Sequence, residues 1–358
     1  MKTAVVILNW NTKDYLRRFL PGVINSCSGP DAEVIVADSA STDGSMQMMA
    51  EEFPGIRTIP LDDNYGFTGG YNRALAEVEA KYYVLLNSDI EVTPGWLEVL
   101  TAWMDSHPDC GACGPKLLSY YDRSRFEYAG AAGGYIDAFG YPFCRGRVLG
   151  RVEQDHGQYD TPAEVFWVSG ACLMVRSSIW KELGGLDGRF FAHMEEIDLC
   201  WRMRLHGWKV QAVPRAAVYH LGGGTLPKDS PWKLELNYRN SLLMLDNNLA
   251  LQIMLEGCPA AKARKIARRQ IFLRKCMDGA AALVYVLQGH PSYAAAVWRA
   301  HSGYRKLRRN PTREQLQANA PAVVSHETAC KGILPRSIIF AEKIHRDKVF
   351  QYTLKHTL

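Results

Sequence analysis

Residues 84–92 have the sequence Val84-Leu85-Leu86-Asn87-Ser88-Asp89-Ile90-Glu91-Val92. The apolar half of this segment, which begins at Tyr82, is typical of a strand buried on both faces in a parallel sheet. The apolar run ends at Leu86, and two carboxylates, Asp89 and Glu91, follow just where the strand should end. Ligands of open α/β sheets bind at the carboxyl ends of the strands, and residues i and i+2 of an extended chain point the same way. The segment therefore predicts a Mg²⁺ or Mn²⁺ site that also holds a diphosphate, although an isolated Asp-x-Glu is more often a solvated surface turn.

Strands and helices alternate on both sides of this segment. Short apolar strands are expected at 4–8, 34–37 and 57–60. Helical spacing of apolar residues is found at 13–24, 72–80 and 96–107. This alternation predicts a doubly wound α/β sheet built from right-handed βαβ units. The polar residues after the strands, Asn11, Asp38 and Asp89, could then line one face of the sheet.

The glycine patterns of two common nucleotide-binding folds are missing from the chain. No G-x-G-x-x-G follows the first strand, which argues against a dinucleotide dehydrogenase, and there is no Walker A sequence. A Gly-rich loop is expected instead at Asn64–Asn72, before a helix over 72–80. A mononucleotide that carries a diphosphate fits these strand ends better than NAD.

A second group of acids, Glu195, Glu196 and Asp198, lies at the start of a helix that should run to His206. Acids at a helix N-terminus favour the helix dipole, which is the simplest explanation for them. An acid cluster that follows Phe190 and Phe191 is also how a general base can be placed beside apolar walls. His220, before a run of glycines, is more often structural, but it becomes a candidate ligand if a metal is bound elsewhere in the site.

The charge of the chain is unevenly distributed. The 358 residues carry a net charge of +5, but residues 261–358 contain 19 Lys and Arg against 5 Asp and Glu. Helical spacing at 263–288 and 293–307 predicts a basic helical C-terminal region. Such helices can lie on an anionic membrane surface or pack on the catalytic unit with a solvated basic face, and amphipathicity alone does not separate the two. Nucleic acid is disfavoured, because no recognised nucleic-acid motif accompanies the charge.

Nothing in the sequence has the length and apolar character of a membrane-spanning helix, and the N-terminus enters a strand without a secretory signal. We therefore expect a cytoplasmic protein that could bind the inner face of a membrane peripherally. The length predicts a catalytic α/β unit at 1–250, followed by an appendage. The basic helical region would then occupy 251–358.

Several segments, taken together and in order, resemble the glycosyltransferase family 2 enzymes, in particular their rhamnosyltransferase-like branch. They agree in order and spacing across about residues 3–250, and they are Val6–Asn11, Val36–Ser45, Asn64–Asn72, Leu85–Asp89, Gly170-Ala171, Glu195–Arg202 and Val218–His220. The resemblance implies a GT-A fold, a doubly wound, mixed and mostly parallel sheet with a helical C-terminal appendage. It also implies a nucleoside-diphosphate-sugar donor, a divalent cation and inversion at the anomeric carbon. It divides 1–250 into a nucleotide-sugar half at about 1–118 and an acceptor half at about 119–250.

Site residues follow from the same resemblance. Asp38 would hydrogen-bond a pyrimidine base, which favours a dTDP- or UDP-sugar. The implied donor-binding residues are Asn11, Asp38, Asn64, Gly69, Gly70, Asn72 and Ser88. The implied metal ligands are Asp89, Glu91 and His220. The Glu-Asp pair of the family falls on Glu195-Glu196, which makes Glu196 the candidate base, with Glu195 and Asp198 as the other candidates.

The sequence departs from the family pattern at Glu196, where the usual residue is Asp, at Ser39 and at the acidic segment after Asn87. The leading hypothesis is an inverting, metal-dependent hexosyltransferase that acts on a cell-surface polysaccharide or a lipid-linked oligosaccharide, with rhamnose as one candidate sugar. Two alternatives are a nucleotidyltransferase, which would release pyrophosphate, and a nucleotide-sugar-binding module that has lost catalysis.

Overall fold

The computed structural model describes residues 1–27, 29–222, 230–311, 313–318 and 331–357. Its centre is a nine-stranded mixed sheet in the order β11-β13-β6-β12-β4-β1-β2-β3, with β5 paired to β13. The strands are β1 (Thr3–Asn9), β2 (Ala32–Ser39), β3 (Arg57–Leu61), β4 (Tyr82–Asn87), β5 (Ile90–Val92), β6 (Cys110–Ser119), β11 (Ala163–Val165), β12 (Cys172–Arg176) and β13 (Lys209–His220). β1 is parallel to both β2 and β4, whereas β12 is antiparallel to β4 and β6. The predicted doubly wound, mixed sheet is confirmed.

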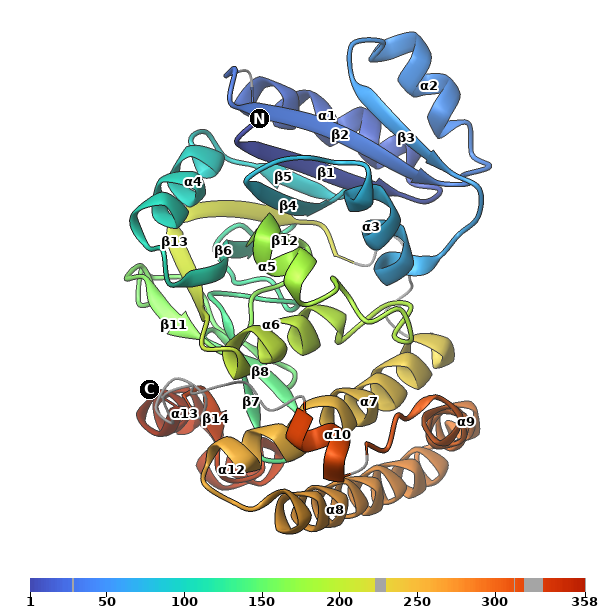
Figure 1. Ribbon diagram of the computed structural model, residues 1–358, viewed down its shortest axis with the longest axis vertical. Helices are drawn as coiled ribbons and strands as arrows, with labels where there is room; N and C mark the ends of the chain where they lie inside the picture. The colour runs from blue at the N-terminus through green and yellow to red at the C-terminus, as the bar shows by residue number, and fades with distance from the viewer. Residues whose placement is uncertain (28, 223–229, 312, 319–330, 358) are drawn as a thin grey trace.

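Helices cover both faces of this sheet (Figure 1). One face packs against α1 (Lys13–Ser26), α2 (Ser45–Glu52) and α4 (Trp96–Ser106), and the other against α3 (Gly66–Ala76), α5 (Ser177–Glu182) and α6 (Glu195–Leu205). Side chains alternate along a strand, so β1 sends Val5 to the first core and Val6 to the second. The buried apolar strands noted in the sequence reflect this cover on both faces.

A smaller, five-stranded sheet has the order β10-β9-β8-β7-β14. Four of its strands come from the segment before β11, and they are β7 (Gly134–Asp137), β8 (Pro142–Cys144), β9 (Arg147–Val148) and β10 (Arg151–Val152). The fifth, β14 (Ile333–Leu334), comes from near the C-terminus and pairs with β7 in parallel. The C-terminal region therefore contributes a strand as well as helices.

The helices of the C-terminal half are α7 (Pro231–Leu255), α8 (Ala260–Leu287), α9 (Pro291–Leu307), α10 (Arg313–Ala318), α12 (Ile338–His345), a 3-10 turn (Arg346–Lys348) and α13 (Val349–Thr357). α7, α8 and α9 pack on one another at the end of the molecule opposite β3, and α7 also contacts α6 (Figure 1). Residue 250 lies inside α7, so this helix is shared between the two predicted units. None of the described helices combines the length and the apolar character needed to cross a bilayer.

Two local expectations are wrong. Residues 84–92 are not one strand, because β4 ends at Asn87, a turn follows at Ser88 and Asp89, and β5 pairs with β13. The expected loop over 64–72 is largely helix, because α3 begins at Gly66. Gly70 lets this helix approach the sheet closely, since an added Cβ would lie 2.7 Å from a methyl carbon of Leu8.

Candidate functional site

Polar side chains form one network where β1 and β2 end. Asn9 Nδ2 donates to Asp38 Oδ1 at 2.6 Å, and Ser41 N donates to Asp38 Oδ2 at 2.9 Å. Thr12 Oγ1 donates to Asn9 Oδ1 at 2.5 Å and lies 2.8 Å from Ser88 Oγ. The network ties the end of β1 to β2 and to the turn after β4. Asp38 and Ser88, two predicted donor-binding residues, are therefore brought to the same edge of the sheet.

Asn11 lies in the loop after β1 and has a left-handed φ of 52°. Its backbone N–H donates to Ser41 Oγ, and its Oδ1 accepts from Thr42 N at 2.7 Å. A non-glycine residue with positive φ persists only where its surroundings hold it, and such residues cluster at functional sites. The two loops after β1 and β2 thus form one frame, with Asn11 exposed at its rim.

Asp89 and His220 form a buried pair at the turn after β4. His220 Nε2 lies 3.2 Å from Asp89 Oδ1, and His220 Nδ1 lies 3.4 Å from Glu127 Oε2 without hydrogen-bond geometry. Burial disfavours the charged imidazole, but the two carboxylates outweigh burial and raise the pKa of His220 to about 10. For Asp89, burial opposes ionisation, while His220 and backbone N–H groups lower the pKa below its usual range. Near neutral pH the pair is therefore a carboxylate beside an imidazolium, with the positive charge on His220.

Glu91 does not join this pair. The turn at Ser88 and Asp89 breaks the extended geometry on which the expectation rested, and Glu91 forms an ion pair with Arg123 at 2.8 Å. Among the described residues, no group of three or more His, Cys, Asp and Glu side chains is placed to hold a metal ion. Asp89 and His220 alone are brought together from the predicted metal set.

The predicted donor-binding residues of α3 have local structural partners. Asn64 Oδ1 accepts from Gly66 N at 2.9 Å at the start of the helix. Asn72 exchanges two hydrogen bonds with the backbone of Leu186, at 2.7 and 2.9 Å. An added Cβ on Gly69 would lie 2.7 Å from Tyr65 Cβ, so Gly69, like Gly70, serves packing. Asn72 and the glycine pair therefore have structural partners in α3 and its surroundings, and their donor contacts stay a prediction.

The acids at the start of α6 behave differently from solvated helix-terminal acids. Glu195 is buried, and the Oε2 atoms of both Glu195 and Glu196 have no hydrogen-bond partner although they are shielded from solvent. Burial raises the pKa of Glu196 to about 7. Burial and the neighbouring Glu196 also raise the pKa of Glu195 well above its usual value. Because the two carboxylates are buried next to each other, they are not both ionised near neutral pH. A carboxylate that can gain or lose a proton in this pH range suits proton transfer.

Asp198 is not available as a base. It is fully buried and accepts from Arg202 Nε, from Asn247 Nδ2 and from Asn248 Nδ2, each at 2.8 Å. These contacts connect α6 to α7. Asp198 therefore positions the helix that carries the Glu195–Glu196 pair.

The loop before α6 is strained and is held by α7. Phe191, His193 and Met194 have positive φ angles of 65°, 71° and 71°. Asn240 Nδ2 donates to the carbonyl oxygens of Phe190, Ala192 and His193 at 2.9, 2.7 and 2.8 Å. Backbone strain of this kind persists only when neighbouring groups fix it. A fully buried amide of α7 therefore sets the position of the Glu195–Glu196 pair.

Asn240→Ala should consequently reduce both stability and turnover. We expect a loss of about 1–3 kcal/mol in unfolding free energy, because buried carbonyls lose their donor. A shift of the acids by about 1 Å would lower turnover by about 10²-fold. Asn237→Ala is the matched control, because Asn237 Nδ2 donates within its own helix, to Lys233 O. Equal effects of the two substitutions in urea unfolding and steady-state kinetics would contradict this role of Asn240.

Gly170 and Ala171 connect the two acidic centres. Asn87 N donates to Ala171 O at 2.9 Å, which places the segment 170–171 beside the turn that carries Asp89. A Cβ on Gly170 would lie 3.5 Å from Glu196 Cβ and 3.3 Å from the Phe67 ring. Glu196 therefore lies beside Gly170, next to the segment that contacts the carboxyl end of β4.

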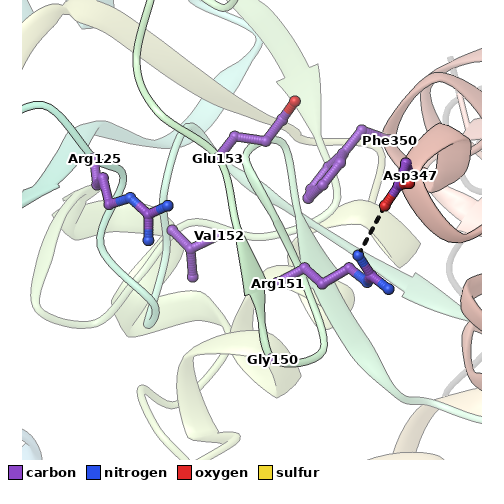
Figure 2. A pocket seen from close by; sticks show the side chains of 7 residues that line it. All are labelled: Arg125, Gly150, Arg151, Val152, Glu153, Asp347 and Phe350. Carbon is purple, nitrogen blue, oxygen red and sulfur yellow. Dashed lines mark hydrogen bonds and ion pairs between the residues drawn. The ribbon is translucent and has the colours of Figure 1, made fainter.

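Some residues of the site were missed by the sequence analysis. Glu127 was not singled out in its Gly- and Tyr-rich segment, and Asn9 was quoted only as part of a strand. Asn240 lies in an ordinary helical pattern, so no local signal distinguished it. A hollow between β10 and α13 contains none of the predicted residues; its Arg151 and Asp347 pair with each other at 3.1 Å (Figure 2).

The sequence of the chain is similar to those of known glycosyltransferases. The family model described as glycosyl transferase family 2 matches residues 4–184. An N-acetylglucosaminyl-diphospho-decaprenol L-rhamnosyltransferase of Mycobacterium tuberculosis is 27% identical over 256 residues, which cover 67% of this chain and 83% of that protein. The rhamnosyltransferase WbbL of Escherichia coli is 24% identical over 225 residues, covering 60% of this chain and 82% of that protein.

Solved structures agree with the fold. TarS of S. aureus, residues 1–349, in complex with UDP-GlcNAc, has a TM-score of 0.53 at 16% identity and covers 89% of this chain and 88% of its own. GalNAc-T7 with UDP, GalNAc and Mn²⁺ also has a TM-score of 0.53 at 16% identity, and covers 68% of this chain and 47% of its own. The fold is that of the GT-A glycosyltransferases, as the resemblance implied.

Proposed function

Because this chain belongs to glycosyl transferase family 2, we propose that it catalyses an inverting, metal-dependent sugar transfer from a nucleoside-diphosphate-sugar to an acceptor hydroxyl. The observation that carries this proposal is the pair of buried carboxylates at the start of α6, whose Oε2 atoms lack hydrogen-bond partners. Gly170 and Ala171 bring them beside the turn of Asp89. A base next to a diphosphate site is what displacement at an anomeric carbon requires.

Glu196 is the proposed general base. Its Oε2 accepts the proton of the acceptor hydroxyl while that oxygen attacks C1 from the face opposite the leaving nucleoside diphosphate. Burial lets the carboxylate hold this proton, because the pKa of Glu196 is raised to about 7. Burial and the neighbouring charge of Glu196 raise the pKa of Glu195, so Glu195 stays protonated and neutral beside the base. A single displacement of this kind inverts the anomeric configuration and needs no covalent intermediate.

Asp89 and His220 are the proposed ligands of a divalent cation. The donor types fit, since one carboxylate and one imidazole face each other at 3.2 Å, and a bound cation would take the place of the imidazolium proton between them. Mg²⁺ in proteins is commonly bound by one or two carboxylates and completed by substrate phosphates and water. When bound, the cation would stabilise negative charge on the departing diphosphate.

The nucleotide would lie against the frame formed by Asn11 and Asp38. Asp38 has both carboxylate oxygens engaged by Asn9 and Ser41, yet each oxygen can accept a further hydrogen bond, such as one from a pyrimidine N–H. A dTDP- or UDP-sugar is the donor class proposed, with rhamnose as the first sugar to test because relatives carry that activity in their names. The acceptor class proposed is a lipid-linked oligosaccharide or a polysaccharide.

We expect dTDP- or UDP-sugars to raise the melting temperature in the presence of Mn²⁺, because a ligand that binds only the folded state stabilises it. GDP-mannose is the comparison, and stabilisation by GDP-mannose alone would contradict the assignment of a pyrimidine nucleotide.

Product assays then test the reaction class. Release of nucleoside diphosphate supports transfer, pyrophosphate release from a nucleoside triphosphate supports a nucleotidyltransferase, and donor binding without turnover supports a binding module.

A glycan acceptor attached to a lipid would place the enzyme at a membrane surface. We therefore include an anionic membrane face among its partners, and a cytoplasmic location with peripheral attachment.

A further inference from the structure

We propose that the outer face of α8, together with the turn into α9, docks the enzyme on an anionic lipid bilayer. The inference rests on the proposed function, because it specifies how a lipid-linked acceptor reaches the Glu195–Glu196 pair. The face is built from two groups of exposed side chains on α8. The first group is basic and consists of Lys262, Lys265, Arg268 and Arg269. The second group is apolar and consists of Phe272, Leu273, Leu283, Val284, Val286 and Leu287.

The two groups lie on one side of α8. Within 262–273 and within 283–287 their positions recur at steps of three or four residues. The ten residues from Leu273 to Leu283 make nearly three turns, so both parts lie on a single helical face. The opposite side carries the buried residues Ala260, Ala263, Ala267, Ile271, Arg274 and Asp278. The exposed apolar side chains are large, with Phe272 63% and Leu287 78% accessible, and Trp298 of α9 is 73% accessible. Large exposed apolar patches mark interaction sites, and no described helix could instead cross the bilayer.

The charge identifies the partner as anionic. Residues 260–309 contain 12 Lys and Arg and a single acid, Asp278. Asp278 is fully buried, where it pairs with Arg274 at 2.8 Å. A basic face with large apolar side chains matches a surface of anionic headgroups above acyl chains. The same excess of positive charge would make two copies of this face repel each other.

The apolar end of α8 is connected to the proposed catalytic site. Tyr285 OH lies 3.4 Å from the hydroxyl of Tyr238 on α7, two residues before the Asn240 that holds the loop before α6. Trp232, at the start of α7, is 43% accessible and its ring lies 5.5 Å from that of Phe191 in this loop. Figure 1 shows the end of α8 and the beginning of α7 on the same side of the molecule. Docking through α8 would therefore bring the bilayer near the side from which an acceptor reaches Glu196.

Vesicle flotation tests the proposal with the full chain and without donor or acceptor. The wild-type protein should float with phosphatidylcholine vesicles that contain about one third phosphatidylglycerol, and not with phosphatidylcholine alone. Leu283→Glu/Leu287→Glu and Lys262→Ala/Lys265→Ala/Arg269→Ala should each weaken binding by at least about tenfold. High salt should weaken binding of the wild type more than that of the triple variant.

Phe340→Glu/Ile344→Glu on α12 is the matched control, because these apolar side chains are 60% and 73% accessible but lie outside the α8 face. An equal loss in this control, or no binding of the wild type to anionic vesicles, would overturn the proposal. A concentration-dependent dimer that Leu283→Glu/Leu287→Glu dissociates would assign the face to a second copy and would also overturn it.

Activity assays separate this inference from the proposed function. Transfer to a water-soluble acceptor should be unchanged in the α8 variants, whereas transfer to an acceptor embedded in anionic vesicles should fall at least about tenfold. Vesicle binding without any transfer would refute the glycosyltransferase proposal alone. Transfer to both acceptors at wild-type rates by the α8 variants would refute the docking face alone.

Discussion

Glu196→Gln is expected to lower turnover by about 10²–10⁴-fold, the usual contribution of a general base, while donor affinity stays unchanged. Glutamine has nearly the same shape as glutamate but cannot accept the acceptor proton. The native Oε2 lacks a hydrogen-bond partner, so the substitution breaks no contact of that atom. Single-turnover transfer kinetics and donor titration measure the two quantities separately.

The pH dependence gives a second readout of the same residue. Burial raises the pKa of Glu196 to about 7, so the wild-type rate should rise about tenfold per pH unit below that value and level off above it. The apparent midpoint belongs to the coupled Glu195–Glu196 pair. The Gln variant should lack this rise over the same range. A wild-type profile that is flat between pH 5 and pH 8 would contradict the assignment of a base with this pKa.

The contribution of Glu196 to folding stability should fall as pH rises, whereas its contribution to the rate should increase. A carboxyl whose folded-state pKa is raised favours the folded protein at low pH, and this contribution is lost as pH rises from the usual 4.5 through about 7. Glu196→Gln removes the cost of ionising a buried group, so the variant should be more stable than the wild type at pH 8. Active-site residues often trade stability for activity in this way.

Two controls show whether the base is assigned to the correct acid. Glu195→Gln should change the pH midpoint and the maximal rate little, because burial, and not the charge of Glu195, raises the pKa of Glu196. A large loss of rate in Glu195→Gln together with a near-normal Glu196→Gln would move the base to Glu195. Asp198→Asn should instead reduce the unfolding free energy, because its carboxylate joins Arg202 of α6 to Asn247 and Asn248 of α7.

The sequence predicted the features that depend on short-range patterns. Apolar strands such as β4 are recognisable because both of their faces are buried, and the polar residues after them follow from the position of the sheet edge. The acids of α6 were singled out from a local pattern as well, because they begin a helix directly after the apolar segment that contains Phe190 and Phe191. Chemistry that depends on residue type and local position was therefore accessible, and the doubly wound sheet is confirmed.

Features that depend on contacts between distant segments were not accessible. Glu91 was expected beside Asp89, but the chain turns between β4 and β5 because β5 pairs with β13, more than a hundred residues later. Asn72 was predicted only as a donor-binding residue, and its hydrogen bond to Leu186, more than a hundred residues later, had no signal in the sequence. β14 joins β7 across about two hundred residues, and no periodicity in a two-residue strand could indicate that. Only tertiary packing decides these pairings.

Asp89→Ala is expected to lower transfer by at least about 10²-fold, because stabilisation of the leaving diphosphate by a metal is worth several kcal/mol. It should also abolish the Mn²⁺-dependent part of nucleoside-diphosphate binding in calorimetric titration. The reason is geometric, since Asp89 Oδ1 faces His220 Nε2 at 3.2 Å beside the end of β4. Removing the carboxylate leaves one protein donor at the proposed cation site.

The Asp89 substitution must be separated from simple unfolding, because it also leaves His220 buried with Glu127 as its remaining acidic neighbour. Asp89→Asn keeps the volume and one oxygen acceptor, so it should fold while losing most of the metal affinity. Glu91→Ala is the matched acid, and it should keep Mn²⁺-dependent binding because Glu91 pairs with Arg123 at 2.8 Å. Full transfer in excess EDTA, or Mn²⁺-dependent donor binding that Glu91→Ala loses and Asp89→Asn keeps, would contradict the assignment of Asp89. If the assignment is correct, the turn at Ser88–Asp89 that breaks the expected strand is also what directs Asp89 toward His220 and away from Glu91.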